Sequence, residues 1–278
     1  MKIRLLIFAI ISIVFFSINT TSAKIPLPLE YRFAMVEFND SIFVLETEVT
    51  VASWLSFYSW VLDNTSVEVA QEVLPDSTLV TKGVWDIFKN KQKTFNNSRT
   101  QSGFPLGYFK GTCDTQSNSL NTNNKSPFYN YPITGISYEQ AMFFCKWQTN
   151  FRGNGVVSYR LPTEKEWKTI AKSSTTKKQI PNPLNNKGNL NFNYNCGDDK
   201  KQNFICRVAN FAQQGSFFDL FGNVSEMTLE KNVSKGGNYQ YSFQNCHIDS
   251  IQIYKKPQVW LGFRYIGVVN QRKSIKNL

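Results

Sequence analysis

The sequence predicts one loop-rich domain of the α+β class. Helix-start signals occur in the first two thirds of the chain, short strand-like runs occur in the last third, and polar stretches separate them. A chain of 278 residues can bury a sizeable core. Aromatic residues make up 15% of the chain and charged residues only 18%. Disordered proteins have the opposite balance, so that class is excluded.

Three helices are predicted from their starts. The starts are Thr50, the pair Ser137 and Gln140, and the pair Thr163 and Glu166. Thr50 precedes Trp54 and Tyr58, whose i, i+4 spacing indicates an apolar helix face. Each of the two pairs has the pattern of a capping box, in which a hydroxyl and the side chain three residues later satisfy each other's backbone N–H groups.

Short strands are predicted in the second half, over residues 233–239, 252–254 and 262–268. Two polar stretches, 115–125 and 173–187, are expected to be surface loops, because apolar motifs resume directly after each. Long loops within one domain predict an irregular fold with modest regular structure.

The first 23 residues have the pattern of a secretory signal peptide. Lys2 and Arg4 form a basic start, residues 5–16 are apolar apart from Ser12, and small residues end at Ala23. This apolar run is shorter than the roughly 20 residues of a transmembrane helix, although an uncleaved anchor is the alternative. We therefore expect an exported domain over residues 24–278. It would be periplasmic, associated with the cell envelope or secreted, and would not span a membrane after cleavage.

Cysteine and histidine usage limits the chemistry. The sequence has five cysteines and no CxxC motif, which excludes a zinc ribbon and a thioredoxin-like centre. In an oxidising compartment, Cys196 and Cys206 are the favoured local pair, although sequence alone does not fix connectivity. Because His247 is the only histidine, a multi-histidine zinc site cannot form and a Ser/His/Asp triad would have to use it.

The net charge of +11 allows two interpretations. It could attract an acidic partner or an anionic envelope surface, or it could reflect an ordinary solvated surface. The lysines form no stripe and no nucleic-acid motif is present, so no nucleic-acid partner is expected.

A series of motifs then points to a known family. The motifs are Thr47-Glu-Val-Thr50, Tyr131-Pro-Ile-Thr-Gly-Ile-Ser137, Phe144-Cys-Lys-Trp147, Arg160-Leu-Pro-Thr-Glu-Lys-Glu-Trp167, Asp219-Leu-Phe-Gly-Asn-Val-Ser-Glu226, Lys235-Gly-Gly-Asn-Tyr239 and Gly262-Phe-Arg264. Over roughly residues 36–268 their order and spacing resemble the formylglycine-generating enzyme, or sulfatase-modifying factor, domain. The resemblance implies a single C-type-lectin-like domain.

Active members of that family oxidise a sulfatase cysteine to formylglycine, using oxygen and a copper(I) ion held by two cysteines. The matching positions here are Tyr241 and Cys246. Copper(I) is soft and favours sulfur, so a phenol at Tyr241 is a poor substitute. Asn238, Ser225 and Met227 also depart from the family's site. We therefore expect no copper and no retained oxidation, and Cys246 would be catalytic only if the enzyme interpretation held.

The family's structural calcium site is better preserved. The resemblance assigns its ligands to Asp219, Gly222, Val224 and Glu226, through two carboxylates and two main-chain carbonyls, and hard oxygen ligands suit calcium. The alternative is that the two acids cap and hold the turn without a metal.

Other residues that match the family motifs are expected to have structural roles. Arg160 and Arg264 are expected to pair with carboxylates such as Glu48, Glu166 or Glu226, because an unpaired buried guanidinium is costly. The family's disulfide at Cys145 is not expected, since the matching partner position is Tyr265.

Taken together, these features predict an exported, non-catalytic family member that acts in protein binding or envelope assembly, for example in gliding or secretion machinery. A protein or glycan partner is expected, with Phe217 and Phe218 as candidate exposed aromatics. Two alternatives stay open: a copper-dependent oxidase of sulfatase cysteines, and a carbohydrate-binding module.

Overall fold

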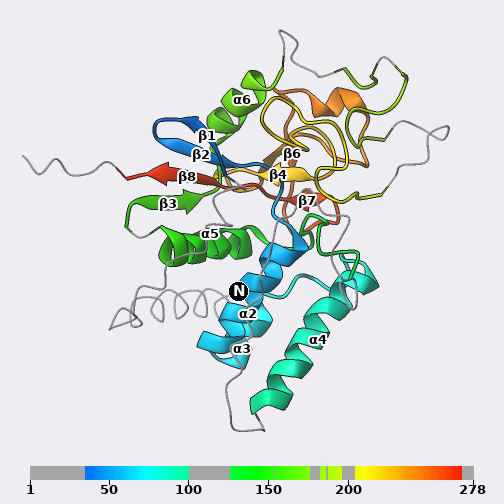
Figure 1. Cartoon of the computed structure of the whole chain (residues 1–278). Coiled ribbons are helices and arrows are strands. Elements are labelled where there is room, and N and C mark those ends of the chain that lie inside the picture. Colours follow the sequence, from blue (N-terminus) through cyan, green and yellow to red (C-terminus); the bar gives the residue numbers. More distant parts are fainter. Residues whose placement is uncertain are drawn as a thin grey trace, which may run out of the picture.

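Two small sheets form the centre of the fold, and helices cover them on two sides (Figure 1). The computed structural model describes residues 35–99, 126–153, 155–175, 182–185, 187–195 and 204–270. The predicted signal peptide and the polar stretch 115–125 lie outside the described residues.

The first sheet joins the start of the described chain to its end. Its strands, in order, are β1 (Met35–Asn39), β2 (Ile42–Leu45), β8 (Ile266–Val269) and β3 (Val157–Arg160). All neighbouring pairs are antiparallel. The β1–β2 hairpin therefore depends for its place on β8, a strand more than 200 residues later.

The second sheet carries the motifs from the last part of the sequence. Its strands, in order, are β6 (Gln252–Ile253), β5 (Val233–Lys235), β4 (Ser225–Met227) and β7 (Leu261–Gly262). The β4–β7 pair is parallel and the other pairs are antiparallel. Glu226 lies opposite Lys235 on one side and Gly262 on the other, so β4 brings three of the family motifs together.

Five α-helices lie within the described residues: α2 (Val51–Asn64), α3 (Val67–Glu72), α4 (Lys82–Arg99), α5 (Tyr138–Arg152) and α6 (Glu164–Ser173). The three predicted starts are confirmed. Thr50 caps α2, and complete capping boxes begin α5 at Ser137 and α6 at Thr163. Helices α3 and α4 and strands β1 to β4 were not predicted.

Two apolar clusters lie on opposite sides of the sheets. In Figure 1, α2 to α5 gather on one side and α6 lies on the other. On the first side Trp54 of α2 stacks on Phe144 of α5, with ring centroids 5.4 Å apart, and Phe263 packs edge-on against both. On the second side Trp167 of α6 packs against Phe221. Both clusters converge on the segment from β7 to β8.

The structure corrects three details of the expected pattern. The run 233–239 is a strand only as far as Lys235, because Gly236 and Gly237 have φ values of 93° and 70° and turn the chain. The run 262–268 is divided between β7 and β8. Phe217 is only 2% exposed, so it is a core residue and not a surface aromatic.

No helix in the described part of the chain is both long and apolar enough to cross a membrane.

Candidate functional site

A buried guanidinium holds the centre of the molecule together. Arg264, which is 1% exposed, follows β7 and donates from Nε to Oε1 of Glu226 at 2.9 Å. Its Nη1 donates to the carbonyl of Leu45 at 2.7 Å and its Nη2 to that of Phe218 at 2.6 Å. The second oxygen of Glu226 accepts from the Trp167 indole at 2.7 Å. Arg264 thus connects β2, β4 and the loop that contains Phe218, and the hydrogen bond from Trp167 connects α6 to the same carboxylate.

Glu48 is a second fully buried carboxylate, and it holds the turn before β4. Its Oε1 accepts from the Val224 N–H at 3.1 Å and its Oε2 from the Asn223 side-chain amide at 2.9 Å. The turn needs glycine at Gly222, where φ is 80° and a Cβ would lie 2.1 Å from the Asn193 carbonyl oxygen. The first family motif therefore supplies Glu48 as the acceptor for the Val224 N–H and the Asn223 side-chain amide, while Arg264 acts on it through its nearby charge.

Asp219 is the third buried carboxylate. Its Oδ2 accepts from the Ala209 N–H at 2.7 Å. Burial raises the pKa of Asp219 to about 6, and Glu226 contributes to the rise. Burial also raises the pKa of Glu48 well above its usual value, with further contributions from the negative charges of Asp219 and Glu226. Three buried acids share one nearby guanidinium, and burial together with their mutual repulsion favours the protonated forms of Glu48 and Asp219.

The predicted calcium ligands lie in this region, but their side chains are already engaged. Both Glu226 oxygens accept hydrogen bonds, from Arg264 and Trp167, and one Asp219 oxygen accepts from Ala209. Within the described residues, no three His, Cys, Asp or Glu side chains form a group that could hold a metal. The donor set as placed fits the guanidinium rather than a calcium ion, so calcium binding at Asp219, Gly222, Val224 and Glu226 stays a prediction.

The other arginine of the family motifs, Arg160, pairs with a carboxylate as predicted. Arg160 makes a bidentate salt bridge with Glu166, in which both N–O distances are 2.7 Å. This contact holds the pKa of Glu166 at about 2, with help from the Thr163 backbone and hydroxyl. Because Glu166 is also part of the capping box, the pair fixes the start of α6 to β3.

The two positions that match the family's copper ligands have different environments. Tyr241 is 38% exposed, and its ring lies on Trp260 with centroids 6.0 Å apart. Cys246 ends a 3₁₀ helix, Phe243–Cys246, and is fully buried in the cluster around Trp167. Burial raises the pKa of its thiol to about 12. One of the two positions therefore holds an exposed phenol and the other a buried thiol.

The other described cysteines are also buried thiols. Cys145 of α5 is free and packs beneath the first sheet, while the matching position Tyr265 packs against Phe144. Cys206 is a free thiol as well, and its predicted pairing with Cys196 lies outside the described residues. Cys196 and Cys113 lie outside the described residues. Burial raises the pKa of Cys206 to about 11, so neither described thiol has the character of a reactive cysteine.

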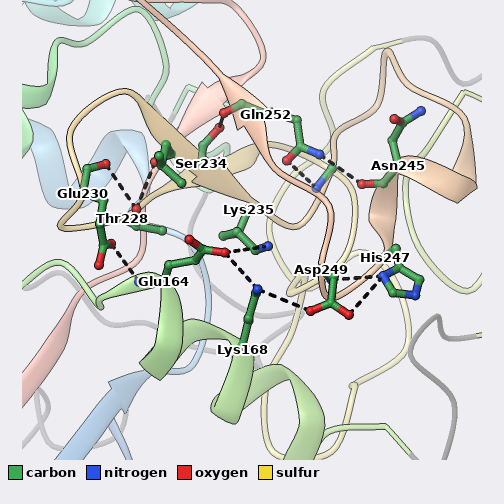
Figure 2. A network of polar contacts seen from close by, with 12 residues as sticks. Glu164, Lys168, Thr228, Glu230, Ser234, Lys235, Asn245, His247, Asp249 and Gln252 are labelled. Carbon is green, nitrogen blue, oxygen red and sulfur yellow. Dashed lines mark hydrogen bonds and ion pairs between the residues drawn. The ribbon is translucent and has the colours of Figure 1, made fainter.

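A charged network around Lys235 was not predicted (Figure 2). Lys235 is fully buried, and its Nζ has no hydrogen-bond partner among the described residues; the nearest anion is Glu164 of α6, 3.7 Å away. Lys168 bridges Glu164 at 3.0 Å and Asp249 at 3.3 Å. Burial, together with the charge of Lys168, lowers the pKa of Lys235 to about 8.

His247 lies at the margin of this network. Its side chain is 26% exposed and its Nδ1 accepts from the Asp249 N–H at 3.0 Å. The sequence signal for the network was weak, because its members come from α6, β5 and the turn after the 3₁₀ helix.

Comparisons with solved structures find folds of related shape. PvdO from Pseudomonas aeruginosa is 15% identical, with a TM-score of 0.43. The match covers 51% of this chain and 63% of PvdO, which is less than two thirds of its length. Treponema denticola variable protein 1 is 15% identical, with a TM-score of 0.48 and coverage of 82% and 84%. CarF is 15% identical, with a TM-score of 0.47 and coverage of 82% and 87%.

No curated relative is found by sequence comparison. The sulfatase-modifying factor enzyme 1-like domain, however, matches residues 32–268, which include all the motifs noted above and every described element except the last residue of β8. The α+β, single-domain expectation is confirmed with it. This chain belongs to the family of sulfatase-modifying factor enzyme 1-like domains.

Proposed function

We propose that this chain is an exported, non-catalytic member of its family that binds a protein or glycan partner in the cell envelope. One observation carries the proposal. At the two positions where active members hold copper(I), this chain has an exposed phenol, Tyr241, and a thiol buried in the core, Cys246.

The chemistry of copper(I) explains why this observation weighs against oxidation. The ion is held by soft thiolate ligands, and a phenol offers only a hard oxygen. Burial keeps the Cys246 thiol protonated, since its pKa is raised to about 12. A copper site would therefore have to deprotonate a buried thiol and recruit a second one from elsewhere in the chain.

The test is a copper(I) titration of the reduced protein against a competing chelator. We expect no tight one-to-one binding that depends on Cys246. Cys206→Ser is the matched control for Cys246→Ser, because both positions are buried free thiols. Tight binding that is lost in Cys246→Ser and kept in Cys206→Ser would overturn the proposal and favour the oxidase. Tyr241→Cys, which restores a thiol at the second position, tests whether this ligand alone accounts for the loss.

The location and the partner need separate experiments. Cleavage after Ala23 predicts that the native protein begins at Lys24, which intact-mass measurement of the protein from cell fractions would test. Detection of an intact N-terminus in the cytoplasm would refute export. Within the envelope, cross-linking followed by mass spectrometry would identify a protein partner, and a glycan array would test the carbohydrate alternative. Assembly within gliding or secretion machinery is the form of this role that the resemblance suggests.

A further inference from the structure

Two large apolar side chains are exposed where α5 turns into β3. Phe151, in the last turn of α5, is 50% exposed, and Val156, just before β3, is 52% exposed. The turn between them is tight, because Gly153 ends α5 and its carbonyl accepts from the N–H groups of both Val156 and Val157. A single exposed apolar residue is ordinary, but two on one turn are a candidate contact surface.

Phe151 is the outer end of a stack of aromatic rings. Its ring stacks on Trp147, with centroids 5.5 Å apart and an interplanar angle of 17°. Trp147 is only 4% exposed and packs in turn on Phe57 in the core. The core therefore supports one face of the Phe151 ring and leaves the opposite face outward. A side chain held in this way has little conformational freedom left to lose when it meets a partner.

The chain leaves the first sheet beside this turn. β8 ends at Val269, opposite Val157 of β3, so the end of α5, the start of β3 and the end of β8 lie at one end of the molecule (Figure 1). Asn270 fixes the point of exit. Its N–H donates to the Val156 carbonyl at 2.7 Å, and its side-chain amide donates to the Gly155 carbonyl at 3.2 Å.

The sequence that follows Asn270 is basic. Residues 271–278 contain no acid and three cations, Arg272, Lys273 and Lys276. A chain spans at most about 3.6 Å per residue, so the first two of these cations have Cα atoms within roughly 11 Å of that of Asn270. Arg152 in the last turn of α5 adds a cation, and the β1–β2 turn, which bonds to the end of β8, adds one acid, Asp40. This end of the chain thus combines exposed apolar side chains with net positive charge.

We propose that this end of the molecule docks on the surface of an anionic lipid bilayer. Phe151 and Val156 enter the headgroup layer, and the basic residues pair with lipid phosphates. A bilayer interface offers an apolar layer and a layer of negative charge side by side, which is the combination that these residues present. An acidic protein would match only the cations unless it also had a pocket for the two apolar side chains. The inference is independent of the proposed function, because it involves neither Tyr241 nor Cys246.

Flotation with lipid vesicles tests the proposal. The mature protein is used, with its start at Lys24 checked by intact mass, so that the apolar residues 5–16 make no contribution. We expect binding to vesicles of equal parts phosphatidylcholine and phosphatidylglycerol, little binding to phosphatidylcholine alone, and weaker binding as the salt concentration rises.

The apolar contact is tested at Phe151. Phe151→Ser should lower the partition coefficient for the anionic vesicles by roughly tenfold, because a half-exposed phenylalanine would no longer enter the interface. Phe204→Ser is the matched control. Phe204 is 60% exposed, but its carbonyl is bound to Asn193 and not to the turn between α5 and β3. This control should bind the vesicles as the wild type does.

The charges are tested without altering any described residue near the turn. Arg272→Gln combined with Lys273→Gln should lower the partition coefficient by roughly 30-fold at low salt, which is about fivefold for each cation. Lys255→Gln combined with Lys256→Gln is the matched control, because these two adjacent lysines are exposed after β6 and their loss changes the net charge equally. It should change binding by less than roughly threefold, since salt screens charges that lie away from the surface.

The charge variants keep the proposal testable if Phe151→Ser does not fold. No binding to the anionic vesicles at low salt, equal binding to the neutral vesicles, or equal losses in a variant and its matched control would each overturn the proposal. Binding to soluble polyglutamate in place of the vesicles would overturn it as well, and would indicate an acidic protein surface as the partner.

Discussion

Replacing Arg264 with methionine tests how the centre of the fold is held. The substitution removes the guanidinium that donates to Glu226 and to the carbonyls of Leu45 and Phe218, and it leaves the nearby acids Glu48 and Asp219 without their cation. Removing one partner of a buried ion pair typically costs about 3–5 kcal/mol. We expect Arg264→Met to lower the free energy of unfolding by that amount at neutral pH.

The loss should depend on pH, which separates charge from packing. Since the pKa of Asp219 is raised to about 6, acidification below that value protonates this acid and lessens the unpaired negative charge. Arg264→Met should therefore cost less at pH 5 than at pH 7.5. Urea unfolding followed by tryptophan fluorescence is a suitable assay, because Trp54 and Trp167 are both buried.

Arg160→Met is the matched control for this experiment. Its ion pair with Glu166 is partly exposed, with side-chain exposures of 30% and 23%, so its loss should cost only about 1 kcal/mol. An Arg264→Met loss no larger than that of Arg160→Met, or a loss that does not change with pH, would refute the proposed role of the buried guanidinium.

Three further predictions follow from the same region. Because the pKa of Asp219 is raised in the folded state, its contribution to the free energy of unfolding is fully present below the unfolded pKa, near 3.8, and is lost as pH rises through about 6. Between these two pH values the free energy of unfolding of the wild type should fall by up to about 3 kcal/mol, and in Asp219→Asn this fall should be absent from unfolding curves measured across the same window. If calcium binds as the family pattern suggests, added calcium should raise the melting temperature of the wild type and not that of Glu226→Gln. If the wild type does not respond to calcium, the calcium prediction is wrong and the Arg264 guanidinium is the cation that pairs with Glu226. Gly237→Ala should lower the free energy of unfolding by about 2 kcal/mol, because φ is 70° and the added Cβ would lie 2.6 Å from the Cys246 sulfur. Gly188→Ala is the control: φ is 74° but the Cβ would lie in open space, so only backbone strain of about 1 kcal/mol is expected. Equal losses in the two variants would contradict the packing argument.

Helix starts were predictable because their causes are local. A capping box involves a residue and its third neighbour, so Ser137 with Gln140 and Thr163 with Glu166 could be recognised without any tertiary contact. The pairing of Arg160 with Glu166 also spans only six residues. Strand ends were less predictable, because they depend on partners in distant parts of the chain.

The candidate site was predictable in its residues but not in its contacts. The motifs singled out Glu48, Asp219, Glu226 and Arg264, yet they did not reveal that the Trp167 indole binds Glu226 or that Glu48 binds the turn at Val224. Nor did they reveal the buried amine of Lys235, because burial of a lysine is a property of the packing around it and not of its neighbours in sequence.

The sequence by itself determined the family, the α+β class and the capped helices, and it predicts the loss of one sulfur ligand at Tyr241. Only the tertiary structure decided that Cys246 is buried, that three acids share one guanidinium, and that β6 is left as an open edge. The physical reason is the separation of the groups involved. Arg264 binds a carboxylate 38 residues away and a carbonyl 219 residues away, and such contacts exist only once the sheets and helices have packed together.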